Sequence, residues 1–217
     1  MTKNILSPLL ICFFCFSLLL QSCKKDKKSD PVPAAGTNSN TNDALFYFTG
    51  SVDGATKSFI QDGKNDSVSS AAGASNSIGV DYSTFKYSTY VAIVGSLADV
   101  IEKESIGIMK GTLKEFSTSV ASDSMFFAFF KKGSAQYSTG AANGIEITYF
   151  DRNKKEWSTS LGSQTGSTFT FDSIEEDKSL FGSFIHFTAS FSCKVYDENG
   201  SFKIISNGKM KSSFQNM

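Results

Sequence analysis

Alternation of apolar and polar residues is the clearest pattern in the chain, and it is longest in the segment SFIHFTASFSCKVY at 183–196. Every second residue from Ile185 to Val195 is apolar or small, and the residues between them are mostly polar. Successive side chains of a strand point to opposite faces, so this pattern predicts a β-strand with one buried face. The turn-forming residues DENG at 197–200 predict that the chain then reverses into a second strand.

Similar short segments occur throughout residues 43–217, which we expect to form a single domain, and turn-forming residues separate them. About ten to twelve short strands joined by hairpins predict an all-β fold, either an antiparallel β-sandwich or, as the alternative, an open β-barrel. The other expected turns lie at Asp53-Gly54, at 151–155, at the acidic segment EEDKS (175–179) and at Asn207-Gly208.

Two segments depart from this pattern. The segment SMFFAFFKK (124–132) is continuously apolar over six residues, which predicts a strand that is buried on both faces. The segment QDGKNDSVSSAAGASNS (61–77) has almost no large apolar residues, and we expect it to be one long polar loop.

The N-terminal 23 residues follow a different pattern. The run from Ile5 to Leu20 is almost wholly apolar and follows Lys3, a pattern that is typical of a signal peptide. This apolar run is shorter than the roughly 20 residues that cross a bilayer as a helix. The segment LLQSC, with Ser22 before Cys23, resembles the lipobox of bacterial lipoproteins. The resemblance implies that residues 1–22 are removed and that Cys23 carries lipid; a plain signal peptide and an uncleaved anchor are the alternatives.

Residues 23–42 contain charged, proline-rich and small polar stretches, so we expect a flexible linker that reaches at most ~60 Å. The start SCKK resembles lipoproteins of the Bacteroidetes type, and this implies an outer-membrane location. Some members carry an acidic run that directs export to the cell surface, but only Asp26 is acidic here among four lysines. Both the periplasmic face and the cell surface therefore stay open. Residues 166–214 also resemble the β-sandwich domains of envelope lipoproteins.

The cysteine count fits this interpretation. Cys12 and Cys15 lie in the expected signal peptide and Cys23 in the lipobox, so Cys193 alone remains and no internal disulfide is expected. After residue 42 there are 16 basic and 19 acidic residues, a net charge of about −3 without a basic patch. We therefore expect the membrane, a glycan or an envelope protein as partner, and neither nucleic acid nor a cofactor.

The titratable residues suggest little chemistry. His186 is the only histidine, so a zinc site made of several histidines is excluded, and its place in the pattern predicts an exposed strand residue. The acidic clusters coincide with predicted turns, where we expect solvated turn chemistry rather than calcium binding or catalysis. These clusters are Asp62 with Asp66, Asp151 with Glu156, 175–177 and 197–198.

Trp157 is the only tryptophan, and Tyr149 and Phe150 lie across the same predicted hairpin. Trp157 and Tyr149 are the candidate ligand-binding residues, as a platform on which a sugar ring stacks, with a role in the core as the alternative. The sequence favours a non-enzymatic, lipid-anchored binding module. A glycan hydrolase with carboxylates on its loops and a structural subunit of an envelope complex are the other hypotheses; a subunit would expose an apolar patch larger than about 400 Å².

Overall fold

The structure, a computed structural model, describes residues 45–61, 68–78, 86–96, 104–115, 121–138 and 144–216. The strands in these ranges form one antiparallel sheet in the order β2-β1-β11-β10-β8-β7-β5-β4-β3, with β9 and β6 attached through β10. The elements are β1 (Phe46–Val52), β2 (Ala55–Gln61), β3 (Val68–Ile78), β4 (Lys86–Ser96), β5 (Ser105–Glu115), α1 (Asp123–Phe129), β6 (Gly133–Ser134), β7 (Ile145–Phe150), β8 (Glu156–Ser158), a 3₁₀ helix (Thr159–Leu161), β9 (Thr168–Ser179), β10 (Gly182–Tyr196) and β11 (Phe202–Asn216).

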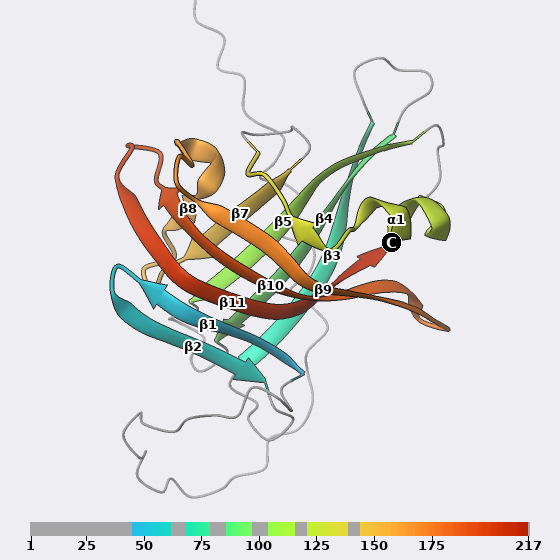
Figure 1. Ribbon diagram of the computed structural model, residues 1–217, viewed down its shortest axis with the longest axis horizontal. Coiled ribbons are helices and arrows are strands. Elements are labelled where there is room, and N and C mark those ends of the chain that lie inside the picture. The colour runs from blue at the N-terminus through green and yellow to red at the C-terminus, as the bar shows by residue number, and fades with distance from the viewer. Residues whose placement is uncertain are drawn as a thin grey trace, which may run out of the picture. The chain divides into compact units, whose positions relative to one another are not determined.

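The sheet curls into a half-barrel, so its two ends approach each other (Figure 1). At one end of the strand order β3 and β4 contact β11, β1 and β2, which lie at or near the other end. The prediction of an all-β antiparallel fold is confirmed. The single curled sheet resembles the open barrel, while its facing limbs enclose one apolar core as the layers of a sandwich do.

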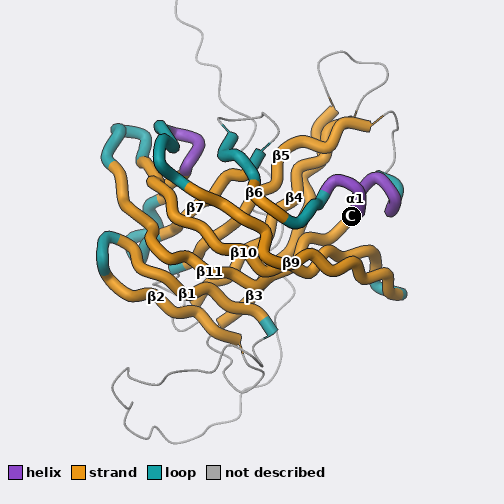
Figure 2. Tube along the Cα trace, viewed as in Figure 1, coloured by secondary structure: helices purple, strands orange, loops and turns teal. Residues whose placement is uncertain are grey.

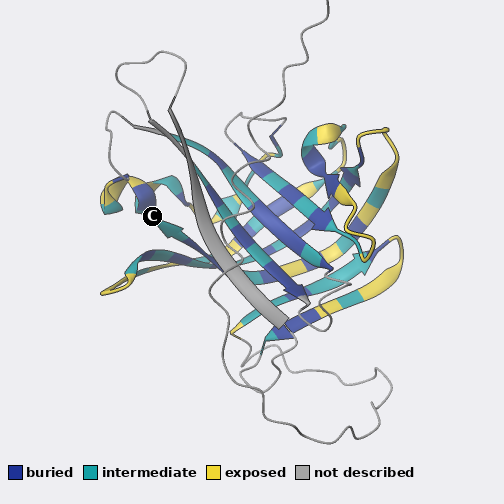
Figure 3. Ribbon diagram, turned by 180° about the vertical axis from the view of Figure 1, so that it is seen from behind, coloured by how far each residue is buried: buried dark blue, intermediate teal, exposed yellow. Residues whose placement is uncertain are grey.

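Strand β10 shows how the alternation of residue types creates this core. Its buried positions alternate without a break from Ser183 to Val195, as the sequence predicted, and β9 and β11 pair with its two edges. Buried and exposed positions alternate along neighbouring strands as well (Figure 3). Phenylalanine rings fill most of the interior; Phe214, for example, stacks on Phe187 and Phe130 with ring centroids 4.7 Å apart in both pairs.

The prediction of a strand at 124–132 was wrong, because this segment contains helix α1. Ser122 caps the helix, since its hydroxyl accepts a hydrogen bond from the backbone N–H of Met125. The ring of Phe126 is completely buried, 4.9 Å from that of Tyr90. A run of phenylalanines satisfies the periods of both helix and strand, so the cap and the aromatic cluster decide between them.

Two other expectations need correction. The segment 61–77 is not one loop, because β3 pairs with β4 over its whole length through backbone hydrogen bonds that small and polar residues also form. Asn207-Gly208 is not a turn either; it lies inside β11 at an irregularity where Asn207 has a φ of 51°. A Cβ on Gly208 would lie 2.6 Å from the Phe191 ring, so this position excludes larger residues.

Several of the described connections lie at two opposite ends of the half-barrel (Figure 2). At one end, which we call the pocket end, lie the turns after β1, β7 and β10. At the opposite end, which we call the tip end, lie the turn between β9 and β10, helix α1 and the C-terminal end of β11 (Figure 1). The 15 residues of β10 join the two ends, a distance of about 45 Å at roughly 3.3 Å per residue. No helix within the described ranges is long and apolar enough to span a bilayer.

Candidate functional site

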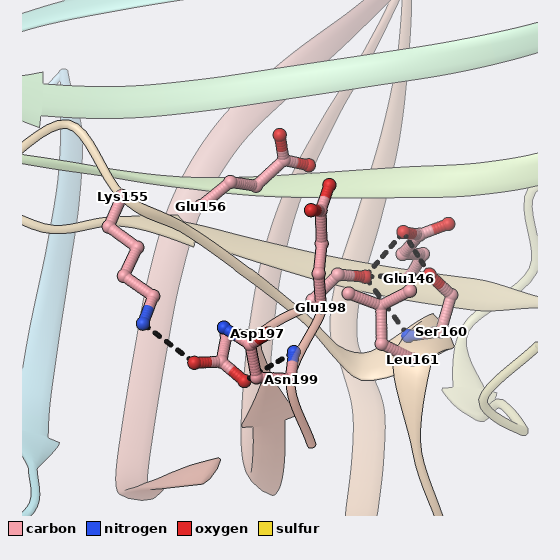
Figure 4. A pocket seen from close by; sticks show the side chains of 9 residues that line it. Glu146, Lys155, Glu156, Ser160, Leu161, Asp197, Glu198 and Asn199 are labelled. Carbon is pink, nitrogen blue, oxygen red and sulfur yellow. Dashed lines mark hydrogen bonds and ion pairs between the residues drawn. The ribbon is translucent and has the colours of Figure 1, made fainter. Parts of the chain in front are cut away.

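A polar hollow of about 310 Å³ opens on the convex side of the sheet at the pocket end (Figure 4). We call it the outer pocket. Strands β7 and β8, the 3₁₀ helix and the turn after β10 form its walls, so its side chains come from distant parts of the sequence. They are Glu146, Lys155, Glu156, Ser158, Ser160, Leu161, Asp197, Glu198 and Asn199.

Glu146 is the acid that β7 contributes to the outer pocket. The residues of β7 alternate, so Ile145 and Ile147 face the core and Glu146 faces the pocket. Its carboxylate accepts hydrogen bonds from the hydroxyls of Ser158 at 2.5 Å and Ser160 at 2.7 Å. These bonds hold the Glu146 carboxyl group in one position and use only part of its hydrogen-bond acceptor capacity.

Glu156 has a different environment in the same pocket. The pocket walls partly enclose its carboxyl group, although the side chain as a whole is exposed, and this enclosure raises its pKa. The negative charges of Glu146 and Glu198 raise the pKa further. Glu156 is therefore the carboxyl group of this pocket whose surroundings favour its protonated form, a property found in general acids of acid–base catalysis.

Asp197 closes the floor of the outer pocket and performs the turn chemistry that the sequence predicted. Its Oδ1 accepts hydrogen bonds from the backbone N–H groups of Asn199 and Ser201, and its Oδ2 lies 2.6 Å from Lys155 Nζ. The hydrogen bond from Lys155 is the main cause of the lowered pKa of Asp197. Lys155 therefore neutralises Asp197, while the three glutamates of the pocket leave it net negative.

An exposed aromatic surface adjoins the outer pocket. Cross-strand pairing places Ser158 next to Tyr196 and Tyr196 next to Phe202 on the convex side. The rings of Tyr196 and Phe202 lie 5.8 Å apart, and Phe202 is 53% exposed. The amine of Lys194 lies 5.7 Å from the centre of the Phe202 ring. The pocket end therefore combines an apolar ring with carboxylate, hydroxyl and amide groups.

Trp157 and Tyr149, the candidate residues from the sequence, pair across the β7–β8 hairpin as expected, but their side chains face the core. Trp157 is 7% exposed and its Nε1 donates a hydrogen bond to Asp151, while the amines of Lys155 and Lys203 lie 4.4 and 4.5 Å from its ring. Because these groups cover the indole, the structure accounts for Trp157 without a ligand. A sugar platform at this residue stays a prediction.

Tyr149 belongs to a buried polar cluster that joins opposite limbs of the sheet. Its hydroxyl donates a hydrogen bond to the carboxylate of Glu104, which precedes β5 and is nearly inaccessible. Lys57, on β2, reaches the same carboxylate at 2.7 Å, and Arg152 lies 3.6 Å from it. Burial and the adjacent Glu104 raise the pKa of Tyr149. Since β2 and β5 are far apart in the strand order, we interpret this cluster as a structural link.

The only histidine lies between a serine and an aspartate, an arrangement that the sequence did not indicate. His186 Nδ1 is 2.6 Å from Ser213 Oγ, and Nε2 is 3.4 Å from Asp177 Oδ2. Ser213 is 5% exposed, so little of it is accessible to a substrate. The three residues lie side by side on β11, β10 and β9, where their contacts join neighbouring strands.

The remaining acidic clusters lie apart from the outer pocket or outside the described residues. Asp151 accepts hydrogen bonds from the backbone N–H groups of Asn153 and Lys155, which is turn chemistry. The cluster 175–177 is part of β9 and not of a turn, which corrects our prediction. Asp62, Asp66 and the expected lipidation site Cys23 lie outside the described ranges. Within those ranges no group of three or more metal-ligating side chains is placed to hold a metal ion.

Of the acids in the outer pocket, the sequence singled out Glu156 and 197–198, which we assigned to turn chemistry. It gave no indication of Glu146, its two serines or Phe202. The alternation in GIEITYF (144–150) could have indicated that Glu146 points away from the core. No local pattern reveals that Ser158 and Ser160 contact its carboxylate, because that contact depends on how β7, β8 and the 3₁₀ helix meet.

Comparisons of the chain with protein-family models, curated proteins and solved structures found no match.

Proposed function

We propose that this protein is a lipid-anchored lipoprotein of the outer membrane whose β-domain is a non-enzymatic module that binds a glycan at the outer pocket. The anchor is supported by the apolar run, by LLQSC at 19–23 and by the linker that follows. Incorporation of labelled palmitate into the intact protein, and its loss in a Cys23→Ser variant, would test this part of the proposal.

The observation that carries the binding role is the exposed Phe202 ring beside a hollow of carboxylate, hydroxyl and amide groups. The C–H face of a sugar ring packs against an aromatic ring, while its hydroxyl groups need acceptors and donors at fixed positions. Glu146 and Glu198 provide acceptors and Asn199 provides both kinds of group. Because the pocket is net negative, we propose a neutral or amine-bearing glycan rather than an acidic one.

Titration of the intact protein with neutral, amine-bearing and acidic oligosaccharides, followed by calorimetry, tests the proposal. We expect the neutral or amine-bearing ligands to bind, and Phe202→Ala to weaken binding by about tenfold, which corresponds to roughly 1.4 kcal/mol. Glu198→Gln should also weaken it. Phe181→Ala is the matched control, because it removes another exposed phenylalanine about 45 Å away at the tip end. Equal affinities of the Phe202 and Phe181 variants, or no binding to any oligosaccharide, would contradict the proposal.

A second candidate function, glycan hydrolysis, is supported by the unequal environments of Glu146 and Glu156. Glu156, with its raised pKa, would be the general acid, and the serine-bound carboxylate of Glu146 would be the base or nucleophile. Release of reducing ends from bound oligosaccharide, lost in both Glu156→Gln and Glu146→Gln, would favour this function. Binding without turnover would favour the non-enzymatic module.

A further inference from the structure

Of the seven large exposed apolar side chains among the described residues, five form two groups at opposite ends of the half-barrel, and Leu45 and Met125 belong to neither group. At the pocket end, Leu161 lines the outer pocket, and Phe202 and Ile204 lie on the first residues of β11. At the tip end, Leu180 and Phe181 form the apex of the β9–β10 hairpin, which we call the apolar tip. Leu180 is 102% exposed and Phe181 86% exposed, and Figure 3 shows the end of this hairpin as exposed.

The hairpin turn does not itself require apolar residues at its apex. Ser179 closes the turn, because its hydroxyl accepts a hydrogen bond from the backbone N–H of Phe181. Gly182 has a φ of 125° and so provides the unusual backbone conformation that the turn needs. Leu180 and Phe181 are not among the residues with positive φ, so polar residues would suit both positions equally well. The two apolar side chains therefore contribute little to the fold.

The hairpin that carries the apolar tip is firmly attached to the domain. Asp123, the first residue of α1, accepts a hydrogen bond from the Ser183 hydroxyl and lies 2.6 Å from Lys178 Nζ. These contacts hold both strands of the hairpin just behind the apex. β10 also pairs with β11 as far as Ser183 and Asn216. The tip is thus presented in a fixed position, which reduces the conformational entropy that a partner must remove on binding.

We infer that the apolar tip is a second membrane contact, which inserts into the interface of the bilayer to which the lipid anchor holds the protein. The inference rests on the lipid anchoring proposed above. The described chain begins at Leu45, and β1 starts beside the half of β11 that leads to the tip end. The first described residue, Leu45, therefore lies on the tip side of the domain and not beside the outer pocket.

The tether also explains how two side chains suffice. Leu180 and Phe181 alone would bind a membrane only weakly, but a linker of about 20 residues keeps the tip at a high effective concentration near the lipid surface. A weak insertion then becomes well populated without any further contact. The outer pocket would face away from the membrane, where a glycan can reach it.

The charges near the tip indicate which lipid surface fits. The acidic residues 175–177 lie three to five residues behind the apex, or about 10–17 Å along the strand. They would remain near the head groups, where an anionic surface would repel them. Lys178 is closer to the apex but is paired with Asp123. The tip therefore fits a zwitterionic bilayer better than an anionic one.

Fluorescence of the full-length, lipidated protein in vesicles of zwitterionic lipid tests the inference. A Phe181→Cys variant carries an environment-sensitive label at the tip, and a Phe202→Cys variant carries it at the pocket end as the matched control. Cys193 is buried, and burial raises its pKa to about 12, so it will not take up the label. Nitroxide-labelled acyl chains should quench the label at 181 several-fold more than the label at 202. An anionic bilayer should reduce this quenching.

A second measurement avoids the label. Trypsin should cleave after Lys178 several-fold more slowly in vesicles than in detergent, and a Leu180→Ser, Phe181→Ser double variant should lose this protection. Equal quenching at both positions, with unprotected cleavage, would overturn the inference and point to a protein partner for the tip. Flotation of the vesicles separates this failure from a failure of the anchor. Protein that floats without quenching leaves the anchor intact, whereas protein that does not float refutes both.

Discussion

Trp157 and Phe202 allow a direct comparison between a buried and an exposed aromatic ring in one domain. Trp157 is 7% exposed within the aromatic core, whereas Phe202 is 53% exposed at the rim of the outer pocket. Truncation of a buried tryptophan to alanine typically costs about 3–5 kcal/mol of unfolding free energy, because transfer and cavity effects add. Truncation of an exposed phenylalanine typically changes it by less than about 0.5 kcal/mol.

These free energies correspond to very different melting temperatures. A domain of this size loses roughly 2–4 °C of Tm for each kcal/mol, so Trp157→Ala should lower Tm by about 6–20 °C. Phe202→Ala should change Tm by no more than about 2 °C. Circular dichroism during heating of the purified variants measures both values under the same conditions.

Ligand binding completes this comparison. At a temperature where both variants remain folded, Trp157→Ala should bind a glycan nearly as well as the natural protein does, and Phe202→Ala should bind it about tenfold more weakly. The reverse result, an unchanged Tm with lost binding in Trp157→Ala, would show that the indole is a ligand platform. It would refute our view that the core and the three polar groups around it account for this residue.

Two further predictions concern titratable groups. Glu156→Gln should raise Tm at pH 7, because the raised pKa of Glu156 means that its ionised form is disfavoured in the folded protein. This gain in Tm should vanish as the pH falls through the pKa of the folded state towards the unfolded value of about 4.3. A destabilised Glu156→Gln variant at pH 7 would contradict this. Tyr149→Phe should lower the unfolding free energy by about 1.5–3 kcal/mol in urea denaturation, since it removes a buried hydrogen bond to the Glu104 carboxylate. An unchanged midpoint of urea unfolding would show that Lys57 and Arg152 alone satisfy this carboxylate.

Much of the fold could be predicted because its signals are local. The period of two in β10 identifies a strand and its buried face, and Asp53-Gly54 and DENG identify turns from single dipeptides or short segments. The same reasoning failed at α1, where repeated phenylalanines match two periods, and at Asn207-Gly208, where a bulge uses residues that also favour turns. It failed at 175–179 because acidic residues also suit an exposed edge strand.

The candidate site depended much less on local signals. Glu156 and Asp197 attracted attention as parts of acidic clusters, but nothing in the sequence relates them to Glu146. The aromatic residue that the sequence suggested as a ligand platform also differs from the one that we propose. Trp157 was chosen for its rarity, whereas Phe202 is one of 21 phenylalanines and differs from most of them only in being exposed.

The sequence by itself determined the all-β class, the buried face of the longest strand and the expectation of a lipid anchor, because each depends on residues that are neighbours in the chain. Only the tertiary structure decided how the sheet curls, which acids share the outer pocket and that Leu180 and Phe181 form the apex of a hairpin. Register and curvature bring together residues that are far apart in sequence, and a two-residue turn lies where strand pairing ends. The register, the curvature and the position of the turn all depend on the summed packing of all strands, and no short segment of the sequence contains that information.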